Sequence, residues 1–459
     1  MTILTASPYA AELGQHGLLR LATAGSVDDG KSTLVGRLLH DTKSVLSDQL
    51  AAVERVSRER GLTAADLALL TDGLRAEREQ GITIDVAYRY FATATRSFVL
   101  ADCPGHVQYT RNTVTGSSTA DVIVLLIDAR KGVLEQTRRH LAVAALLRVP
   151  HVVFAVNKID LVDFSESVFR AVESQLQTVA HDLGVTGARA IPVSALDGDN
   201  VAARSSRTPW YAGPALLELL ETLPASAEVV TGSFRLPVQL VLRPQAAARE
   251  QAWRDYRGYA GQVASGSVRV GDEVVVLPSG LRTSVTGIAV GERRLDEAVA
   301  RQSVTVQLAD DLDVSRGDVI VSAHDVPAST QDVAAFVCWL GETPLRPGAR
   351  ALVKHGARTV QAVVRTIEGR LDLDALHSVP AESLSLNDIG HVTLRLAQPL
   401  PIEAYAVSRP GGAFLLIDGH DGATLAAGMA RRRSTVEEPR AVRGPLAAQG
   451  PVLAEGPRP

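Results

Sequence analysis

The sequence predicts an α/β domain, with a mostly parallel sheet and helices on both faces, followed by two antiparallel β-barrel domains. Between residues 18 and about 225, apolar strand-like runs alternate with helical patterns, as in domains built around a parallel sheet. Near Pro224 the helical patterns largely stop, and short valine-rich runs separated by Gly, Asp, Pro and Ser begin. A glycine-rich loop lies between the first strand and the first helix, where open α/β sheets bind ligands.

Periodicity and flanking turn residues place the elements of the α/β region. The expected strands are Leu18–Ala24, Tyr88–Ala92, Arg96–Asp102, Val122–Asp128, His151–Asn157 and Ala190–Ser194. The expected helices are Ser32–His40, a long stretch within Asp48–Arg60, Val107–Thr115, Leu134–Arg148 and Ser165–Leu183. The most apolar run, Val122–Ile127, is too short to span a bilayer and fits a strand buried on both faces.

The two β-rich blocks are defined by short apolar runs between turn signals, which favour closed or nearly closed antiparallel barrels. The first block is expected to contain strands at Phe234–Leu242, Arg257–Ser265, Asp272–Leu277, Thr283–Val290, Ser303–Leu308 and Asp318–Val321. The second is expected to contain Asp332–Leu340, Ala349–His355, Arg358–Thr366, Gly390–Ala397 and Ala413–Ile417. After Met429 the chain becomes rich in Pro, Gly and Ala without aromatic residues, so this tail is expected to be disordered.

Composition narrows the class of protein. The 459 residues suffice for about three domains, and 46% hydrophobic with 21% charged residues is a normal globular balance. A net charge of −4 argues against a general nucleic-acid binder. The two cysteines, Cys103 and Cys338, are too few and too far apart for a disulfide framework or a metal site. With neither a signal-peptide pattern nor a membrane span, we expect a cytoplasmic protein with reduced thiols.

The glycine-rich loop has the G-x-x-x-x-G-K-S pattern of a phosphate-binding loop. It consists of Gly25, Ser26, Val27, Asp28, Asp29, Gly30, Lys31, Ser32 and Thr33. The glycines at 25 and 30 allow the backbone N–H groups to converge on phosphate oxygens. Lys31 is the point charge for the outer phosphates, and Ser32 is placed to hold a magnesium ion. The following helix adds the positive end of its dipole.

Two further motifs are expected to face the terminal phosphate. Within Gly81–Asp85, the hydroxyl of Thr83 can complete the shell of a magnesium ion, although the pentapeptide alone is weak evidence. The second motif consists of Asp102, Cys103, Pro104, Gly105 and His106, directly after a strand. Its aspartate can hold magnesium through water, its glycine can donate an N–H to the phosphate, and its histidine can orient or polarise an attacking water. Whether that histidine acts as a base stays open.

The remaining two motifs suit a guanine base. The Asn-Lys-x-Asp motif consists of Asn157, Lys158, Ile159 and Asp160, after the strand that ends there. Its aspartate would accept from the ring N1–H and the exocyclic amine, its asparagine would bond the opposite edge, and its lysine stem would cover a ring face. Adenine has neither donor and would leave the aspartate unpaired, which rejects it strongly. The run Ser194, Ala195 and Leu196 supplies a backbone N–H near the guanine carbonyl.

Together, five motifs in this order, each next to the end of a strand, are specific for a GTPase that binds GTP and Mg²⁺. The fold class is therefore an α/β P-loop GTPase domain followed by two antiparallel β-barrel domains. Hydrolysis would depend on positioning and electrostatics. The residues expected to act in it are Lys31, Thr83 and His106. The expected segments are a leader (1–17), the GTP-binding domain (18–225), two β-barrel domains (226–328 and 329–430) and the tail (431–459).

The motifs resemble those of translation-factor-type GTPases such as elongation factor Tu, and more narrowly the GTPase (large) subunit of bacterial sulfate adenylyltransferase. The narrower resemblance rests on the amino-acid sequences of the segments 25–41, 79–91 and 102–112, and it covers residues from about 15 to 430. Elongation factors usually carry His where Asp29 stands and Arg where Gln80 stands. The runs Arg257–Gly261 and Leu345–Gly348 agree more loosely.

The resemblance implies a partner. Subunits of this family pair with a small catalytic subunit that transfers AMP from ATP to sulfate, giving adenosine 5′-phosphosulfate and pyrophosphate, and GTP hydrolysis drives that unfavourable reaction. Higher-order assembly of such heterodimers is a further expectation. The sequence contains no second phosphate-binding loop, so the adenylyl transfer is expected on the partner, and a fused adenylylsulfate kinase is not expected.

Two alternatives stay open. One is a translation factor that delivers aminoacyl-tRNA, against which Asp29, Gln80 and the lack of a clear basic stripe count only moderately. The other is a nucleotide-gated assembly protein that binds GTP but barely hydrolyses it.

Overall fold

The computed structural model describes residues 17–59, 65–70, 86–104, 110–224, 232–244, 254–373 and 376–431. Three predicted site residues, Thr83, Gly105 and His106, lie outside this range, as do nearly all of the predicted leader and tail. The chain divides into two compact units, the first covering Met1–Ala225, Asp372–His377 and Val442–Pro459 and the second covering Ser226–Leu371 and Ser378–Ala441.

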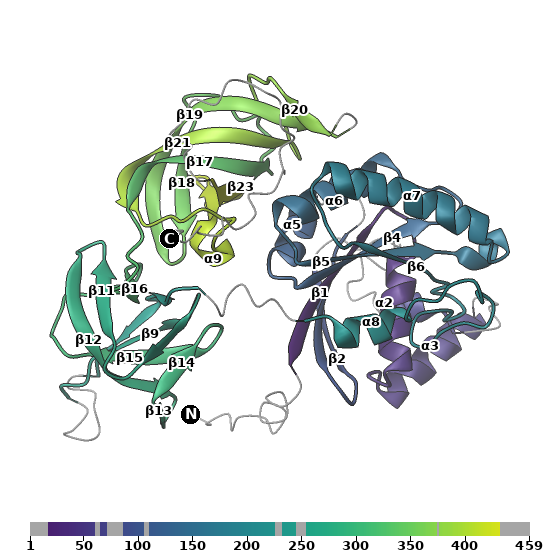
Figure 1. The fold of residues 1–459 in the computed structure, drawn as a ribbon, viewed down its shortest axis with the longest axis horizontal. Helices are drawn as coiled ribbons and strands as arrows, with labels where there is room; N and C mark the ends of the chain where they lie inside the picture. Colours follow the sequence, from purple (N-terminus) through teal and green to yellow (C-terminus); the bar gives the residue numbers. More distant parts are fainter. Residues whose placement is uncertain are drawn as a thin grey trace, which may run out of the picture. The chain divides into compact units, whose positions relative to one another are not determined.

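A six-stranded sheet forms the centre of the first unit (Figure 1). Its strands are β1 (Leu18–Gly25), β2 (Ala87–Ala92), β3 (Ser97–Asp102), β4 (Val122–Asp128), β5 (His151–Asn157) and β6 (Arg189–Pro192). Their order in the sheet is β2-β3-β1-β4-β5-β6. Only the pairing of β2 with β3 is antiparallel, which confirms the mostly parallel sheet.

Helices cover both faces of this sheet, as predicted. They are α2 (Lys31–Asp41), α3 (Ser47–Glu59), α5 (Thr110–Ser118), α6 (Glu135–Leu146), α7 (Glu166–Asp182) and α8 (Leu216–Thr222), with short 3₁₀ turns η1 (Leu67–Leu70) and η3 (Ile159–Val162). In Figure 1, α5, α6 and α7 lie on one face, and α2 and α8 on the other. Leu34 and Leu38 of α2 and Leu216 of α8 are buried in one core cluster with residues of β1, β3 and β4. This packing holds the beginning of α2 against the carboxyl end of β1.

The second unit begins with a curled antiparallel sheet. Its strands are β7 (Arg235–Pro237), β8 (Leu240–Leu242), β9 (Gly258–Gln262), β11 (Glu273–Leu277), β12 (Leu281–Val290), β13 (Arg293–Leu295), β15 (Ser303–Leu308) and β16 (Val319–Ser322), with β10 (Ser267–Arg269) and β14 (Glu297–Val299) as a separate pair. The main order is β7-β16-β11-β12-β15-β9-β8. Hydrogen bonds of 3.1 Å from Arg235 N to Ser265 O and 2.8 Å from Ala264 N to Arg235 O join β7 to the chain just after β9. The predicted, nearly closed barrel is confirmed.

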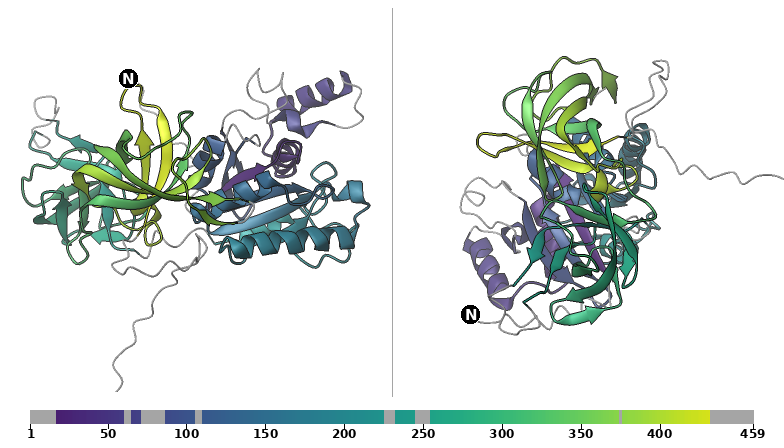
Figure 2. Two further views of the ribbon diagram at one scale, coloured as in Figure 1. Left: turned by 90° about the horizontal axis from the view of Figure 1, so that it is seen from above. Right: turned by 90° about the vertical axis from the view of Figure 1, so that its left-hand side faces the viewer.

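A second barrel completes this unit. It contains β17 (Thr330–Trp339), β18 (Arg350–His355), β19 (Arg358–Asp372), β20 (His377–Val379), β21 (Ile389–Leu400), β22 (Ala413–Ile417) and β23 (Thr424–Ala430), with the one-turn helix α9 (Arg409–Gly412). The order β18-β22-β23-β17-β21-β19 closes into a ring because β18 also pairs with β19. Figure 2 shows these strands from two other directions.

Some boundaries differ from the sequence predictions. The run predicted as one strand from Phe234 to Leu242 is split into β7 and β8, and β19 extends six residues past the predicted end at Thr366, to Asp372. Strand β23 was missed because Ala and Gly have low β propensity. Its Gly428 is nevertheless required, because a Cβ there would lie 2.2 Å from the ring of Phe414. The partner strands, not local propensity, make this segment a strand.

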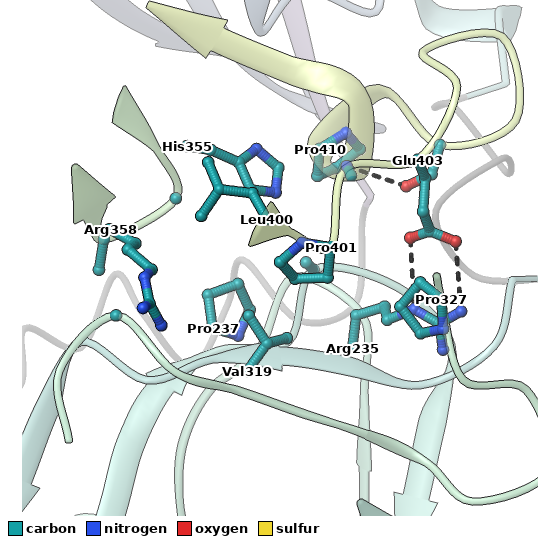
Figure 3. A pocket seen from close by; sticks show the side chains of 16 residues that line it. Arg235, Pro237, Val319, Pro327, His355, Arg358, Leu400, Pro401, Glu403 and Pro410 are labelled. Carbon is teal, nitrogen blue, oxygen red and sulfur yellow. Dashed lines mark hydrogen bonds and ion pairs between the residues drawn. The ribbon is translucent and has the colours of Figure 1, made fainter. Parts of the chain in front are cut away.

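Arg235 joins the two barrels of the second unit. Its guanidinium lies 2.9 Å from Asp325 of the first barrel and 3.2 Å from Glu403 of the second. Figure 3 shows Arg235 and Glu403 beside a small cavity of about 40 Å³, lined mainly by prolines and aliphatic side chains. His355 also lines this cavity, and its Nδ1 lies 2.9 Å from the carbonyl oxygen of Ala413. The cavity has room for little more than a water molecule, so we assign it to packing.

Candidate functional site

The phosphate-binding loop lies between the end of β1 and the start of α2, as the sequence predicts. Gly30 has φ +92° and begins the helix without a side-chain cap, and a Cβ there would lie 2.4 Å from Nδ2 of Asn157. Gly25 has φ +152°, and a Cβ there would lie 2.7 Å from the carbonyl oxygen of Leu126 in β4. Both glycines are therefore required by backbone conformation and by close neighbours. Asp28 also has a left-handed conformation, with φ +65°.

Lys31 is buried within the loop. Its Nζ donates to the carbonyl oxygens of Gly25 and Ser26, both at 2.8 Å. Burial lowers the pKa of this ammonium, while the carboxylates of Asp102 and Asp29 oppose that shift. The side chain thus folds back over the loop, where it would meet the outer phosphates of a nucleotide.

Asp29 braces the loop from inside. Its Oδ2 accepts a hydrogen bond of 2.7 Å from the N–H of Ser26, and the residue is only 1% exposed. Its Oδ1 and the hydroxyl of Ser26 are buried without a hydrogen-bond partner among the described residues. Burial raises the pKa of this carboxyl above its ordinary value, against the opposing effects of the Ser26 N–H and Lys31. Asp29 is therefore a positioning residue for the loop backbone.

The described part of the motif after β3 lies next to the loop. Asp102 is buried and aligned with Thr23 of β1, whose hydroxyl donates to its Oδ1 at 2.9 Å. Cys103 is fully buried, and burial raises the pKa of its thiol far above the ordinary value, so the group stays a neutral thiol. A Cβ on Gly116 of α5 would lie 2.4 Å from its Sγ, which shows how closely this helix packs on the motif. Pro104 is also buried.

Asn157 connects three of the predicted motifs. Its Nδ2 donates to the carbonyl oxygen of Asp29 at 2.7 Å, and its Oδ1 accepts from the N–H of Ala195 at 2.9 Å. Lys158, in a left-handed conformation, donates to the carbonyl oxygen of Asp28 and forms an ion pair of 3.1 Å with Asp128. The sequence assigned Asn157 to the base alone, whereas in the structure it also holds the two loops together.

The rest of the base motifs lie on neighbouring loops. Ile159 is buried and begins the 3₁₀ turn η3, while Asp160 in that turn is partly exposed. Ser194 and Ala195 are buried, whereas the side chain of Leu196 is exposed. The structure therefore brings together the loop 25–33, Asp102, the Asn-Lys-x-Asp motif and the run 194–196 at the carboxyl ends of β1, β3, β5 and β6.

Sequence analysis missed two residues of this region. Asp128 ends β4, and its carboxylate pairs with Arg130 at 2.7 Å and with Lys158. Burial alone would raise its pKa, but hydrogen bonds from Arg130 and Lys158 hold the pKa well below its ordinary value. The same signal that marked Asp102, an acid ending a buried strand, also applies to Asp128. His140 of α6 is fully buried, and burial followed by the charge of Lys31 lowers its pKa to about 3; no sequence signal separates it from a core histidine.

The comparisons with known proteins agree with this geometry. Residues 16–228 match the family model described as the elongation factor Tu GTP binding domain, and residues 332–431 match the model described as GTP-eEF1A C-terminal domain-like. The described residues include no helix long and apolar enough to cross a membrane. They also contain no cluster of three or more His, Cys, Asp or Glu residues with the arrangement of a metal site.

Three curated relatives match most of the chain. The bifunctional enzyme CysN/CysC of Mycobacterium tuberculosis (strain H37Rv) is 50% identical over 92% of this chain and 68% of its own length. Sulfate adenylyltransferase subunit 1 of Teredinibacter turnerae is 48% identical over 92% of this chain and 89% of its own length. The subunit of the same name from Cellvibrio japonicus is 47% identical over 95% and 92%.

Proposed function

The chain belongs to the family of sulfate adenylyltransferase subunit 1, and from this premise we propose that it is the GTPase subunit of a two-subunit sulfate adenylyltransferase. One observation carries the proposal. The relatives of that name match at 47–48% identity over at least 92% of the chain. The two family models with translation-factor descriptions match residues 16–228 and 332–431 separately, whereas the relatives named sulfate adenylyltransferase subunit 1 match nearly the whole chain, which favours this function over the translation-factor alternative.

GTP binding would use the geometry described above. The N–H groups of the phosphate-binding loop and Lys31 would hold the phosphates at the beginning of α2. Asp160 would accept hydrogen bonds from the ring N1–H and the exocyclic amine of guanine, and the run 194–196 would donate to its carbonyl. The hydrogen bond from Lys158 to the carbonyl oxygen of Asp28 holds the lysine side chain extended from the base motif to the phosphate loop. The lysine stem would then cover one face of the base.

The donor set also fits a magnesium ion. The Ser32 hydroxyl at the start of α2 and the Asp102 carboxylate at the end of β3 are oxygen donors, which Mg²⁺ prefers. Asp102 is held by Thr23 at 2.9 Å, so its carboxylate is oriented without an ion. Ser32 would bind directly and Asp102 through water, together with Thr83 from the loop outside the described residues. A bound ion would neutralise part of the phosphate charge.

In hydrolysis, the protein would supply positioning. His106 would orient or polarise the attacking water next to the terminal phosphate, while Gly105 would donate its N–H to that phosphate. The neighbouring Asp102 and Lys31 are buried, so charges act strongly there. Thr83 and its neighbours would contact the terminal phosphate, so hydrolysis would change the conformation of this segment.

The site that binds ATP and sulfate would lie on the partner subunit. We expect a small subunit to transfer AMP from ATP to sulfate, with GTP hydrolysis on this chain driving the formation of adenosine 5′-phosphosulfate and pyrophosphate. Heterodimers of this kind could also assemble further, an expectation carried by the resemblance alone. Both cysteines are buried free thiols, which supports the proposed cytoplasmic location.

A reconstitution assay tests this function. Synthesis of adenosine 5′-phosphosulfate from ATP and sulfate is measured for this chain, for its small subunit and for both together, with and without GTP. We expect no synthesis by this chain alone, and faster synthesis by the pair when GTP is present. The Lys31→Ala variant should remove the acceleration by GTP because it loses the phosphate contact. A rate of synthesis that does not respond to GTP would refute the coupling.

A further inference from the structure

We infer that Arg37, on the helix after the phosphate-binding loop, determines base specificity by fixing the main chain at Ala195 and Leu196. The inference rests on the proposed binding of GTP. It assigns to Arg37 the selection of the C6 carbonyl of guanine, whereas Asp160 selects the opposite side of the ring. Arg37 is thus a positioning residue, because it acts on the base through the backbone of another loop.

Arg37 bonds two consecutive carbonyls from a distant part of the chain. Its Nε donates to the carbonyl oxygen of Ala195 at 3.2 Å, and its Nη2 donates to that of Leu196, across 158 and 159 residues of sequence. A guanidinium presents several N–H donors in one plane, so it can hold two neighbouring carbonyls at once. The side chain is 19% exposed, and its bond to Ala195 is partly shielded from water whereas its bond to Leu196 is exposed.

These bonds orient the N–H groups of the loop. In a trans peptide the carbonyl and the following N–H point in opposite directions, so holding the Ala195 carbonyl turns the N–H of Leu196 away from α2. The preceding peptide is held by Asn157, which accepts from the N–H of Ala195. The turn is closed by the N–H of Gly198, which donates to Ser194 O at 2.7 Å. The orientation of the N–H groups expected to face the guanine carbonyl is therefore fixed from both sides.

Shape and charge both support this role. Gly198 has φ +91°, and a Cβ there would lie 3.6 Å from Cδ and Nη1 of Arg37, so the arginine stem packs against the turn. A cation that donates to a carbonyl polarises the peptide and strengthens the N–H on its other side as a donor. Arg37 also forms an ion pair of 3.6 Å with Asp41 one turn along α2, and both side chains are 19% exposed. An i,i+4 pair of this kind contributes little.

The inference is tested with three triphosphates that differ only in the base. GTP has the C6 carbonyl, the N1–H and the 2-amino group, and inosine triphosphate lacks only the 2-amino group. In 2,6-diaminopurine riboside triphosphate an amine replaces the carbonyl and N1 has no proton; the loss of the N1–H affects the wild type and the Arg37 variants alike, so a change in preference between them reports on the carbonyl. Dissociation constants of the full chain are measured by competition against a fluorescent GTP analogue. In Arg37→Ala, we expect the preference for GTP over the diaminopurine nucleotide to fall about tenfold, because roughly one hydrogen bond is at stake. The preference for GTP over inosine triphosphate should change less than twofold.

Two variants serve as controls. Arg37→Lys keeps the charge but can hold one carbonyl rather than two, so its loss of preference should be smaller. Asp41→Asn removes the charge that pairs with Arg37 and with His40, and it should leave both preferences unchanged. Equal loss of affinity for all three nucleotides, or an unchanged preference over the diaminopurine nucleotide, would overturn the inference. If Arg37→Ala fails to fold, a wild-type preference in Arg37→Lys would overturn it instead. Absence of any GTP preference in the wild-type chain would refute the proposed function itself.

Discussion

The side-chain amide of Asn157 donates a hydrogen bond to the main-chain carbonyl of Asp29, with 2.7 Å between Nδ2 and the oxygen. This contact, together with the one from Lys158 to the carbonyl oxygen of Asp28, joins the phosphate-binding loop to the base motif, which lies 128 residues later in the sequence. The same side chain accepts from the N–H of Ala195, so one residue aligns the loops for both ends of the nucleotide.

Replacing Asn157 should therefore weaken binding of the whole nucleotide. Asn157→Ala removes two hydrogen bonds and leaves a buried carbonyl and a buried N–H without this partner. We expect GDP and GTP affinities to fall by roughly 10- to 100-fold, measured by isothermal calorimetry. Gln177→Ala is a matched control, because its amide also donates to a backbone carbonyl, that of Ala188 at 3.0 Å, on the surface. Comparable losses in both variants would contradict the alignment role of Asn157.

The raised pKa of Asp29 predicts that the free energy of unfolding depends on pH. Burial raises the pKa of this carboxyl in the folded chain, so ionisation opposes folding at pH values above the ordinary pKa of 3.8. The penalty is absent at lower pH, where the group is protonated in both states. Asp29→Asn keeps an acceptor for the Ser26 N–H and removes the charge. We expect it to raise stability at pH 7 by on the order of 1 kcal/mol, and this gain should vanish as the pH falls toward 4.

Asp128, in the same site, predicts the opposite pH dependence of stability, because its pKa is lowered. Hydrogen bonds from Arg130 and Lys158 outweigh burial and hold the pKa of Asp128 below its ordinary value, so its charge stabilises the fold at neutral pH and this contribution is lost on acidification. Asp128→Asn should therefore be less stable than the wild type at pH 7. Both variants are compared by urea unfolding of the nucleotide-free chain from about pH 2 to 8, because the contribution of Asp128 is lost only below the ordinary pKa of 3.8. Differences that do not change with pH in either variant would rule out this assignment.

The proposed hydrogen bonds of Asp160 to guanine predict that its replacement changes the base preference. Asp160→Asn replaces an acceptor by a group that can also donate, which suits the C2 carbonyl of xanthine better than the amine of guanine. We expect the preference to shift from guanosine toward xanthosine triphosphate, measured by competition between the two nucleotides. Asp163→Asn, at an exposed site just after the same 3₁₀ turn, should leave the preference unchanged. Undiminished preference for GTP in Asp160→Asn would count against the role.

The sequence predicted those parts of the site that depend on local pattern. Strands β4 and β5 have the predicted bounds, because continuous apolar runs end at the polar residues Asp128 and Asn157. The same pattern placed the phosphate-binding loop and the Asn-Lys-x-Asp motif at the sheet edge. The roles of the residues at 29–31, 102 and 157–160 in binding GTP stay predictions, as do those of Thr83 and His106 outside the described residues.

What the sequence could not give depends on contacts between distant segments. The bonds from Arg37 to Ala195 and Leu196 span 158 and 159 residues and leave no periodic signal. Position 428 of β23 requires glycine because the ring of Phe414 occupies the space of a side chain, which only the paired strands reveal. Such effects of tertiary packing override local propensity.

The last prediction concerns the two β barrels. The Arg235 side chain is 6% exposed and lies between Glu403, whose side chain is 20% exposed, and Asp325, whose side chain is 59% exposed. Arg235→Met would leave the carboxylate of Glu403 partly buried without this partner, at a cost of roughly 2 kcal/mol in the free energy of unfolding. Asp325→Asn should cost less than about 1 kcal/mol because water screens that pair. Adding Glu403→Gln to Arg235→Met should recover part of the loss in urea unfolding of the full chain, since it removes the unpaired charge. A double variant less stable than Arg235→Met would show that Glu403 stabilises the barrels through contacts other than this ion pair.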